Sequence, residues 1–196
     1  MATAAENKSI KRRSILDAAT RLFTDKSVAE TAIDEVVQLA GVAKGTFYLY
    51  FRDKYDLFDQ IVLHRTAEVF AESCKSLRDS IASPAEQFMT LADNIAAYLQ
   101  KNKKVTALID RRFSACLTQP MQEENEDLCG AVEHLTDLLS VNVSREEARR
   151  QLYILIDMIG SVCCSTILNP HPYGPDEILP TLHTMLYRFF GGGELA

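Results

Sequence analysis

Apolar residues return along the chain with the spacing of amphipathic helices, and no segment of the sequence shows the alternation of a β-strand. Ile33, Val36, Val37 and Ala40 stand at i, i+3, i+4 and i+7, so they share one face of a short helix. Similar stripes follow, up to a last predicted helix over residues 176–190. The pattern therefore predicts an all-α protein.

Residues 31–56 are predicted to form two short helices joined by a glycine turn, followed by the start of a third helix. Thr31, with Asp34 three residues later, is typical of a capping box that begins the first helix. Gly41 stands where a left-handed residue is needed to end that helix. Such a pair is typical of a helix-turn-helix, whose second helix lies in the major groove of DNA.

The second helix of this pair is predicted over about residues 43–51. Phe47 and Phe51 are one turn apart on it and are expected to anchor it inward. The neighbouring face carries a lysine, a bare glycine and a tyrosine, which can approach phosphates and base edges closely. The residues that share this face are Lys44, Gly45, Tyr48 and Leu49.

The run AGVAKGTFYLYF from Ala40 to Phe51, followed by Lys54 and Leu57, resembles the signature of the TetR family of transcriptional regulators. Three residues of the preceding helix also match that family, namely Ala18, Leu22 and Phe23. The resemblance implies an N-terminal three-helix helix-turn-helix head, residues 1–54. A long fourth helix would join it to a helical ligand-binding and dimerisation domain, residues 55–196. It also implies a repressor that binds a palindromic DNA operator as a homodimer, needs no cofactor, and is released by a small-molecule effector.

The same resemblance assigns DNA contacts to seven residues of this sequence: Thr31, Lys44, Gly45, Thr46, Tyr48, Tyr50 and Lys54. Thr31 and Tyr50 are expected to contact phosphates, and Lys54 is expected to clamp the DNA backbone at the start of the fourth helix. The other four are expected in or beside the groove. Ala43 departs from the family, in which many members have Ser or Thr, so a hydroxyl for capping or for a phosphate is missing there.

Helix start signals divide the rest of the chain. Asp53 and Asp56 predict the N-cap and N3 positions of the fourth helix, which keeps its apolar period to about residue 77. Capping boxes at Ser83 and Ser144 start two more helices. Other helices are predicted over about residues 105–117, 120–140 and 176–190, and Pro180 is expected to delay the regular part of the last one.

The helices predicted over residues 144–168 and 176–190 are too apolar for one small domain to cover. We expect them to pair with their counterparts in a second copy of the chain, as a four-helix interface. A pocket for a largely apolar or aromatic compound is expected among the helices of the second domain. Its candidate lining is Phe88, Leu91, Ile95, Phe113, Cys116, Met121, Leu155, Met158 and Ile159, with plain core packing as the alternative for each residue.

Asp157 interrupts this apolar region, and a carboxylate there is unfavourable unless it is paired or exposed. It is expected to pair with Arg111 or Arg112, to face the dimer partner, or to meet a cationic ligand.

Charge is unevenly distributed over the sequence, whose net charge is −6. Residues 1–65 carry 10 Lys and Arg against 9 Asp and Glu, whereas residues 66–196 carry 11 against 18. A nearly neutral head predicts DNA binding through placed contacts on one face, since bulk positive charge is lacking.

The five cysteines show neither a CxxC pair nor zinc-like spacing with histidine, and are expected to be reduced thiols of a cytoplasmic protein. They are expected to be buried structural residues, with redox sensing by Cys116 or Cys129 left open. The histidines form no metal set. Asp157, Ser161 and Ser165 interrupt the longest apolar run, which predicts no membrane span.

Hydrolase, zinc-protease and phosphate-loop patterns are absent from the sequence, which favours a protein that is not an enzyme. Two alternatives to a ligand-switched repressor stay open. One is a DNA-binding helical dimer without a small-molecule switch, which a second domain lacking a ligand-sized pocket would favour. The other is an all-helical enzyme of unknown type.

Overall fold

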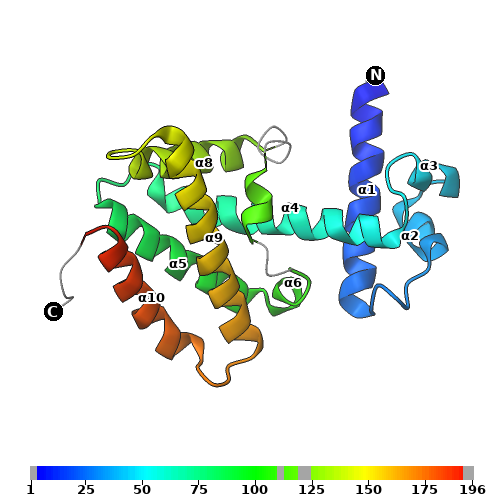
Figure 1. Cartoon of the computed structure of the whole chain (residues 1–196). Coiled ribbons are helices and arrows are strands. Elements are labelled where there is room, and N and C mark those ends of the chain that lie inside the picture. The colour runs from blue at the N-terminus through cyan, green and yellow to red at the C-terminus, as the bar shows by residue number, and fades with distance from the viewer. Residues whose placement is uncertain (1–3, 110–112, 119–124, 192–196) are drawn as a thin grey trace. The chain divides into compact units, whose positions relative to one another are not determined.

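A computed structural model describes residues 4–109, 113–118 and 125–191, and these residues form helices and connecting turns without a strand (Figure 1). The predicted all-α fold is confirmed. Two compact units divide the chain, Met1–Leu63 and His64–Ala196. α4 (Lys54–Cys74) contributes residues to both units. The domain boundary predicted after residue 54 stays a prediction.

The first unit contains α1 (Ala4–Asp25), α2 (Ile33–Ala40), α3 (Lys44–Tyr48) and the first half of α4. Each helix turns one apolar face inward, as its spacing predicts. The buried residues of this core include Ile15, Ala18, Ala19, Phe23, Val36, Val37, Phe47, Phe51, Leu57 and Ile61. Ala18 and Phe23, which match the family in the sequence, are therefore core residues of the head.

The turn between α2 and α3 depends on Gly41, which has the predicted left-handed conformation, with φ 67° and ψ 33°. Its N–H donates to the carbonyl of Gln38 at 3.3 Å, and the N–H of Val42 donates to the carbonyl of Val37 at 3.0 Å. These two bonds satisfy carbonyls at the end of α2 that would otherwise lack partners. A side chain at this position would strain the backbone.

The capping box predicted from Thr31 and Asp34 is wrong. The N-cap of α2 is Ala32, and the carboxylate of Glu35 at N3 accepts its N–H at 2.8 Å. Lys26 donates to the same carboxylate at 2.7 Å and, with the Ala32 N–H, lowers the pKa of Glu35. Thr31 is buried, and its hydroxyl donates to the Ser27 carbonyl at 3.0 Å. The cap therefore lies one residue later than the sequence indicated.

The second unit contains the C-terminal half of α4, η1 (Lys75–Leu77), α5 (Pro84–Lys101), α6 (Lys103–Thr106), η2 (Phe113–Leu117), α8 (Glu126–Leu139), α9 (Arg145–Leu168) and α10 (Pro175–Phe189). α5 packs against α9 and α10, and α8 packs on α9 (Figure 1). The α5 side of the core consists of Phe88, Leu91, Ala92, Ile95 and Leu99, which follow the helical spacing.

Several helix starts agree with the predicted caps. The Asp53 carboxylate accepts the N–H groups of Tyr55 and Asp56 at 2.8 and 2.9 Å, which begins α4 at Lys54. Ser83 accepts from the Glu86 N–H, and the Glu86 carboxylate accepts the Ser83 N–H at 2.8 Å, as a capping box requires. Ser144 likewise accepts the Glu147 N–H, at 3.2 Å.

Three boundaries differ from the prediction. α6 ends at Thr106, and a 3-10 helix over Phe113–Leu117 stands where a longer helix was expected. α8 starts at Glu126, with Asn125 as its N-cap; residues 120–124 of the predicted 120–140 helix lie outside the described part of the chain. α10 starts at Pro175 and includes Pro180. Proline has no N–H, so the carbonyl of Asp176, four residues earlier, loses its helical hydrogen bond. Because Asp176 is exposed, water can take the place of that bond.

α9 has 24 residues and is long and apolar enough to cross a membrane by length and composition alone. Core helices pass the same test. The buried residues on this helix are Ala148, Leu152, Leu155, Ile156, Ile159, Gly160, Cys163 and Cys164. Tyr153, Ile154 and Leu168 on the same helix are exposed. The apolar character of α9 thus corresponds to the core on one side and to an open surface on the other.

Phe113 of η2 lies directly on Gly160 of α9, in the middle of the second unit. A Cβ added at Gly160 would overlap the Phe113 ring, whose own side chain is fully buried. The Ser114 hydroxyl also donates to the Asp157 carboxylate at 3.0 Å, one helical turn away on α9. Together these contacts hold η2 against α9.

We predict that Gly160→Ala lowers the free energy of unfolding by about 1–3 kcal/mol, because the Phe113 ring must leave its position. Gly130 in α8 is the matched control, since a Cβ there would meet nothing within 4 Å. Gly130→Ala is expected to raise stability by about 0.5–1 kcal/mol. Urea denaturation of the two variants measures both effects, and equal stabilities would contradict the packing described for Phe113.

Candidate nucleic-acid interface

α3 is short, and buried aromatic side chains fix which way it faces. Phe47 is fully buried, and Phe51 beyond the helix end is also buried. Helical hydrogen bonds continue past Tyr48, because the N–H groups of Leu49 and Tyr50 donate to the carbonyls of Thr46 and Phe47 at 3.3 and 3.0 Å. The predicted inward anchors are therefore in place, and the opposite face of α3 is left open.

Ala43 is the N-cap of α3, with an extended backbone at φ −73° and ψ 149°, and it supplies no side-chain hydrogen bond. The missing hydroxyl noted in the sequence is thus a missing cap. An alanine N-cap makes a helix less stable by about 1 kcal/mol than Ser or Thr would. α3 consequently depends on tertiary packing more than on its own ends.

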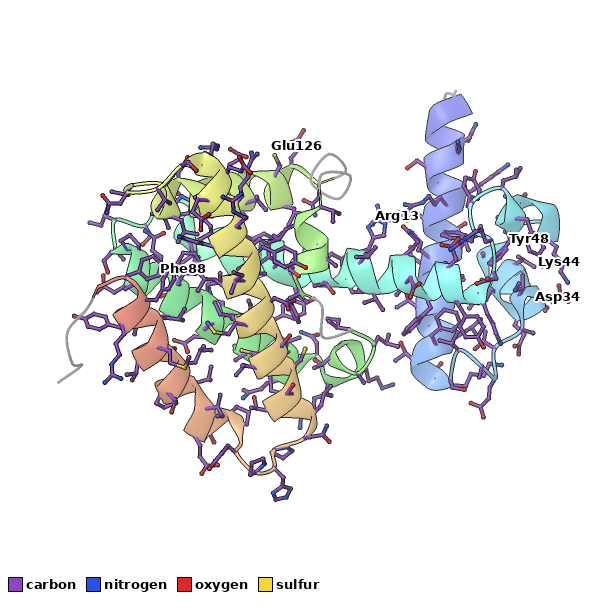
Figure 2. The ribbon with its side chains drawn as sticks, in the orientation of Figure 1. Arg13, Asp34, Lys44, Tyr48, Phe88 and Glu126 are labelled. Atoms are coloured by element: carbon purple, nitrogen blue, oxygen red, sulfur yellow. The ribbon has the colours of Figure 1, made fainter. Side chains whose placement is uncertain are left out.

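The open face of α3 contains Lys44, Gly45 and Tyr48, all exposed (Figure 2). A Cβ at Gly45 would meet nothing within 4 Å, so no contact inside the protein requires glycine there. Tyr48 is 53% exposed and packs edge-on against the Phe47 ring at 5.3 Å, which holds its ring outward. Thr46 is half-buried beside them. The surface thus presents the ammonium of Lys44, the uncovered backbone of Gly45 and the phenol of Tyr48.

Lys44 is paired with an acidic residue of the preceding helix. Its ammonium lies 2.8 Å from the Asp34 carboxylate, and this hydrogen bond raises the pKa of Lys44. Figure 2 shows Asp34, Lys44 and Tyr48 together on one side of the head. A shallow groove there is lined by Thr31, Ala32, Ile33, Asp34, Lys44, Tyr48, Asp53, Lys54 and Tyr55. Asp34 is therefore a groove residue and not the predicted cap residue. An acid and a base in the first turns of two adjacent short helices are the signal in the sequence that indicates such a pair.

Lys54 connects the loop between α1 and α2 to the start of α4. Its ammonium donates to the carbonyls of Ala29 and Thr31 at 2.6 and 3.0 Å, and lies 5.6 Å from the centre of the Tyr55 ring. A lysine has three N–H donors, so these two bonds leave one for a phosphate. The phosphate clamp assigned to Lys54 stays a prediction, and the structure gives this residue a bracing role as well.

The two predicted phosphate contacts differ in position. Thr31 is 1% exposed with its hydroxyl already donated to Ser27, so its side chain faces away from solvent. Tyr50 is half-buried after α3, with its ring 6.3 Å from that of Phe51. Both DNA contacts stay predictions, and the burial of Thr31 speaks against a contact through its hydroxyl.

The nine residues predicted to line a ligand pocket fall into three groups. Phe88, Leu91, Ile95, Phe113, Cys116 and Ile159 are fully buried core residues. Leu155 and Met158 line an apolar groove of about 190 Å³ between α9 and α10, together with Gln151, Ile154, Met185, Leu186 and Phe189. Met121 lies outside the described residues. The structure therefore does not bring the described members together around one groove.

Asp157 has a partner among the described residues. Its carboxylate accepts the Ser114 hydroxyl at 3.0 Å and the Ser114 N–H at 3.3 Å. Arg111 and Arg112, the partners predicted for it, lie outside the described part of the chain. The described environment of Asp157 is therefore a link between α9 and η2.

The five cysteines all lie in the described residues and form no disulfide, and burial raises the pKa of Cys116 to about 12. Its thiol donates to the Phe113 carbonyl at 2.8 Å. A thiol held protonated is unreactive, which favours the structural interpretation of Cys116. Within residues 4–109, 113–118 and 125–191, His, Cys, Asp and Glu form no group of three or more that could hold a metal ion.

Residues 15–61 match the family described as bacterial regulatory proteins, tetR family, and this segment contains the whole of α2, α3 and the Gly41 turn. This segment is the DNA-binding domain of a TetR-family transcriptional regulator. A helical second unit follows it, as in TetR-like regulators of known structure.

Two HTH-type transcriptional regulators are matched over part of their length. YhgD of Bacillus subtilis, itself uncharacterized, is 28% identical over 118 residues, which is 60% of this chain and 54% of YhgD. AcrR of Shigella flexneri is 46% identical over 50 residues, 26% of this chain and 23% of AcrR. The chain thus spans about half or less of the length of these relatives.

The crystal structure of FadR from Bacillus subtilis in complex with stearoyl-CoA has the same fold, with a TM-score of 0.55. The match covers 89% of this chain and 96% of FadR at 18% sequence identity. The likeness of fold therefore extends beyond the head into the second unit.

Proposed function

We propose that this TetR-family regulator is a cytoplasmic repressor that binds a near-palindromic DNA operator as a homodimer and is released by a small, largely apolar effector. The observation that carries the DNA part is the open face of α3, where Lys44, Gly45 and Tyr48 stand over the buried Phe47. Such a face can enter a major groove, with the lysine and the phenol as hydrogen-bonding groups. We expect half-sites about one helical turn apart, ~34 Å or somewhat more.

We predict that Tyr48→Ala weakens operator binding by ~1–3 kcal/mol and relaxes sequence preference at one position, because a base-reading contact is lost. Lys44→Ala is expected to weaken operator binding as well. Tyr48→Phe separates the hydroxyl from the ring. Tyr173→Ala removes an equally exposed tyrosine from the second unit and serves as the control. Binding is measured on a duplex that the wild-type protein selects from a random pool; unchanged affinity in both α3 variants would show that the groove assignment is wrong.

The dimer part of the proposal is supported by an apolar surface on α9 and α10. Ile154 on α9 and Met185 and Phe189 on α10 are at least half exposed, and they flank the groove that also contains Leu155 and Met158. Contiguous exposed apolar surface of this kind is typical of an association site. An isologous contact of α9 and α10 with their counterparts would bury it.

We predict that Ile154→Glu weakens the dimer at least tenfold, ~1.4 kcal/mol, since a carboxylate would have to enter an apolar interface. Ile81→Glu is the matched control, because Ile81 is fully exposed and lies outside α9 and α10. Sedimentation at micromolar concentration distinguishes the two variants. A wild-type protein that stays monomeric would contradict the proposed dimer.

The effector part of the proposal uses α4, which carries Lys54 at its first residue and buries Phe70 and Cys74 in the second unit. A compound that binds two positions of α4 with different affinities shifts their populations and with them the DNA affinity. The stearoyl-CoA held by FadR supports an apolar compound. Entry next to η2 would require the Phe113 ring to leave Gly160.

We predict that at least one apolar compound raises the midpoint of thermal unfolding and releases the selected duplex at the same concentration. The screen includes neutral compounds, long-chain acyl-CoA and cationic compounds. Asp157→Asn is expected to preserve binding of neutral compounds, because the Asp157 carboxylate is engaged by Ser114. Loss of cationic ligands alone in this variant would instead assign the carboxylate to ligand binding.

A DNA-binding dimer without a small-molecule switch is the second candidate function. The observation that favours it is the complete burial of Phe88, Leu91 and Ile95 in the core of the second unit. If no compound affects either readout while the operator is still bound, this second function replaces the switched repressor.

A further inference from the structure

The ion pair between Asp34 and Lys44 is not explained by the folding of the head. Glu35, not Asp34, closes the N-terminus of α2, and it also supplies a negative charge in the first turn. The side chains of Asp34 and Lys44 are 70% and 54% exposed. Ion pairs this exposed contribute little to stability. The pairing of Asp34 with Lys44 therefore adds little to the stability of the head beyond the charge that Asp34 itself places in the first turn of α2.

The position of Asp34 affects how Lys44 can meet DNA. Asp34 and Lys44 line the same shallow groove as Tyr48, so a duplex that approaches this face meets the carboxylate as well as the ammonium. Phosphates repel the carboxylate, and Lys44 must leave it to make a full contact with a phosphate. A duplex that is contacted only through its phosphates is thus bound less tightly than it would be if Lys44 were not paired with Asp34.

A specific duplex can compensate for this loss. A carboxylate in the major groove accepts a hydrogen bond from the amino group of cytosine, while a lysine donates to guanine. Only base edges offer an amino donor, because the phosphate backbone has acceptors alone. On the correct sequence, hydrogen bonds from the bases to the Asp34–Lys44 pair can therefore restore the binding free energy that is lost on a random sequence.

We propose that Asp34 is a specificity-determining residue of this regulator, which weakens binding to random DNA more than binding to the operator by holding Lys44 in an internal ion pair. This inference rests on the proposed DNA-binding function. Asp34 acts through Lys44. It increases the ratio of the affinities for operator and random DNA, and it does not increase the affinity for DNA in general.

The experiment compares affinities for two duplexes, the one selected by the wild-type protein from a random pool and a scrambled duplex of the same composition. Asp34→Asn keeps the shape of the side chain and removes its charge. Affinity for the scrambled duplex is expected to rise about threefold to fivefold, with a salt slope steeper by about one. Affinity for the selected duplex is expected to rise less or to fall, so that the ratio of the two affinities decreases.

Three further variants test the mechanism. Asp34→Glu keeps the charge and is expected to restore the ratio. Asp79→Asn removes the same charge from an exposed residue of the second unit and is expected to leave the ratio unchanged. In a Lys44→Ala background, Asp34→Asn is expected to raise affinity for the scrambled duplex by much less than it does in the presence of Lys44, because it relieves only the direct repulsion between the carboxylate and the phosphates.

The outcomes separate this inference from the function on which it rests. A wild-type protein that selects no duplex would overturn both. A selected duplex whose affinity ratio is unchanged by Asp34→Asn would overturn the role of Asp34 and leave the DNA-binding function standing. An equal gain with and without Lys44 would show Asp34 to be an ordinary surface charge, which also overturns the proposal.

Discussion

The burial of Phe47 is the interaction on which the DNA-facing surface depends. α3 has five residues and an alanine N-cap without a side-chain bond, so it is far too short to be stable as an isolated helix. Its conformation comes from the aromatic ring packed beneath it and from the left-handed Gly41 before it. The outward direction of Tyr48 follows from that anchor, since neighbouring residues on a helix point about 100° apart. Lys44 lies one turn before Phe47, at the exposed first residue of α3, and pairs there with Asp34.

In the second unit, too, a buried aromatic side chain positions a short helix, within a core to which several helices contribute. Phe113 on Gly160 and Ser114 on Asp157 are two contacts of different kinds between the same two elements. Close-packed contacts of this kind are bistable, because a ring either occupies its site or leaves it. A regulator that responds to a compound needs such a discrete alternative, and η2 is a short element whose position on α9 is set by these two contacts.

Much of the architecture followed from local chemistry that a sequence displays. Asp53, Ser83 and Ser144 begin helices because a short side chain followed three residues later by an acidic residue satisfies free N–H groups, and Gly41 ends one because its backbone tolerates a positive φ. The cap of α2 was misplaced because Asp34 and Glu35 are adjacent acids, and side-chain length decided between them.

The other differences required tertiary information. Lys54 donates to Ala29, 25 residues earlier, and no spacing rule predicts a lysine that braces a loop. Six of the nine candidate pocket residues are fully buried, but periodicity cannot distinguish the lining of a cavity from a filled core. Which of them face one another depends on how helices pack, as the position of Phe113 on Gly160 shows.

Cys116 gives this protein a built-in reporter of its own internal motion. Its sulfur lies in the same 3-10 turn as Phe113 and donates to the Phe113 carbonyl, and burial keeps the thiol protonated. A thiol reagent can react with it only after that turn has opened to water, so the rate of modification measures how often η2 leaves α9. With Cys74, Cys129, Cys163 and Cys164 replaced by alanine, Cys116 is the remaining thiol, and its labelling kinetics would report the opening of η2 without any knowledge of the compound that causes it.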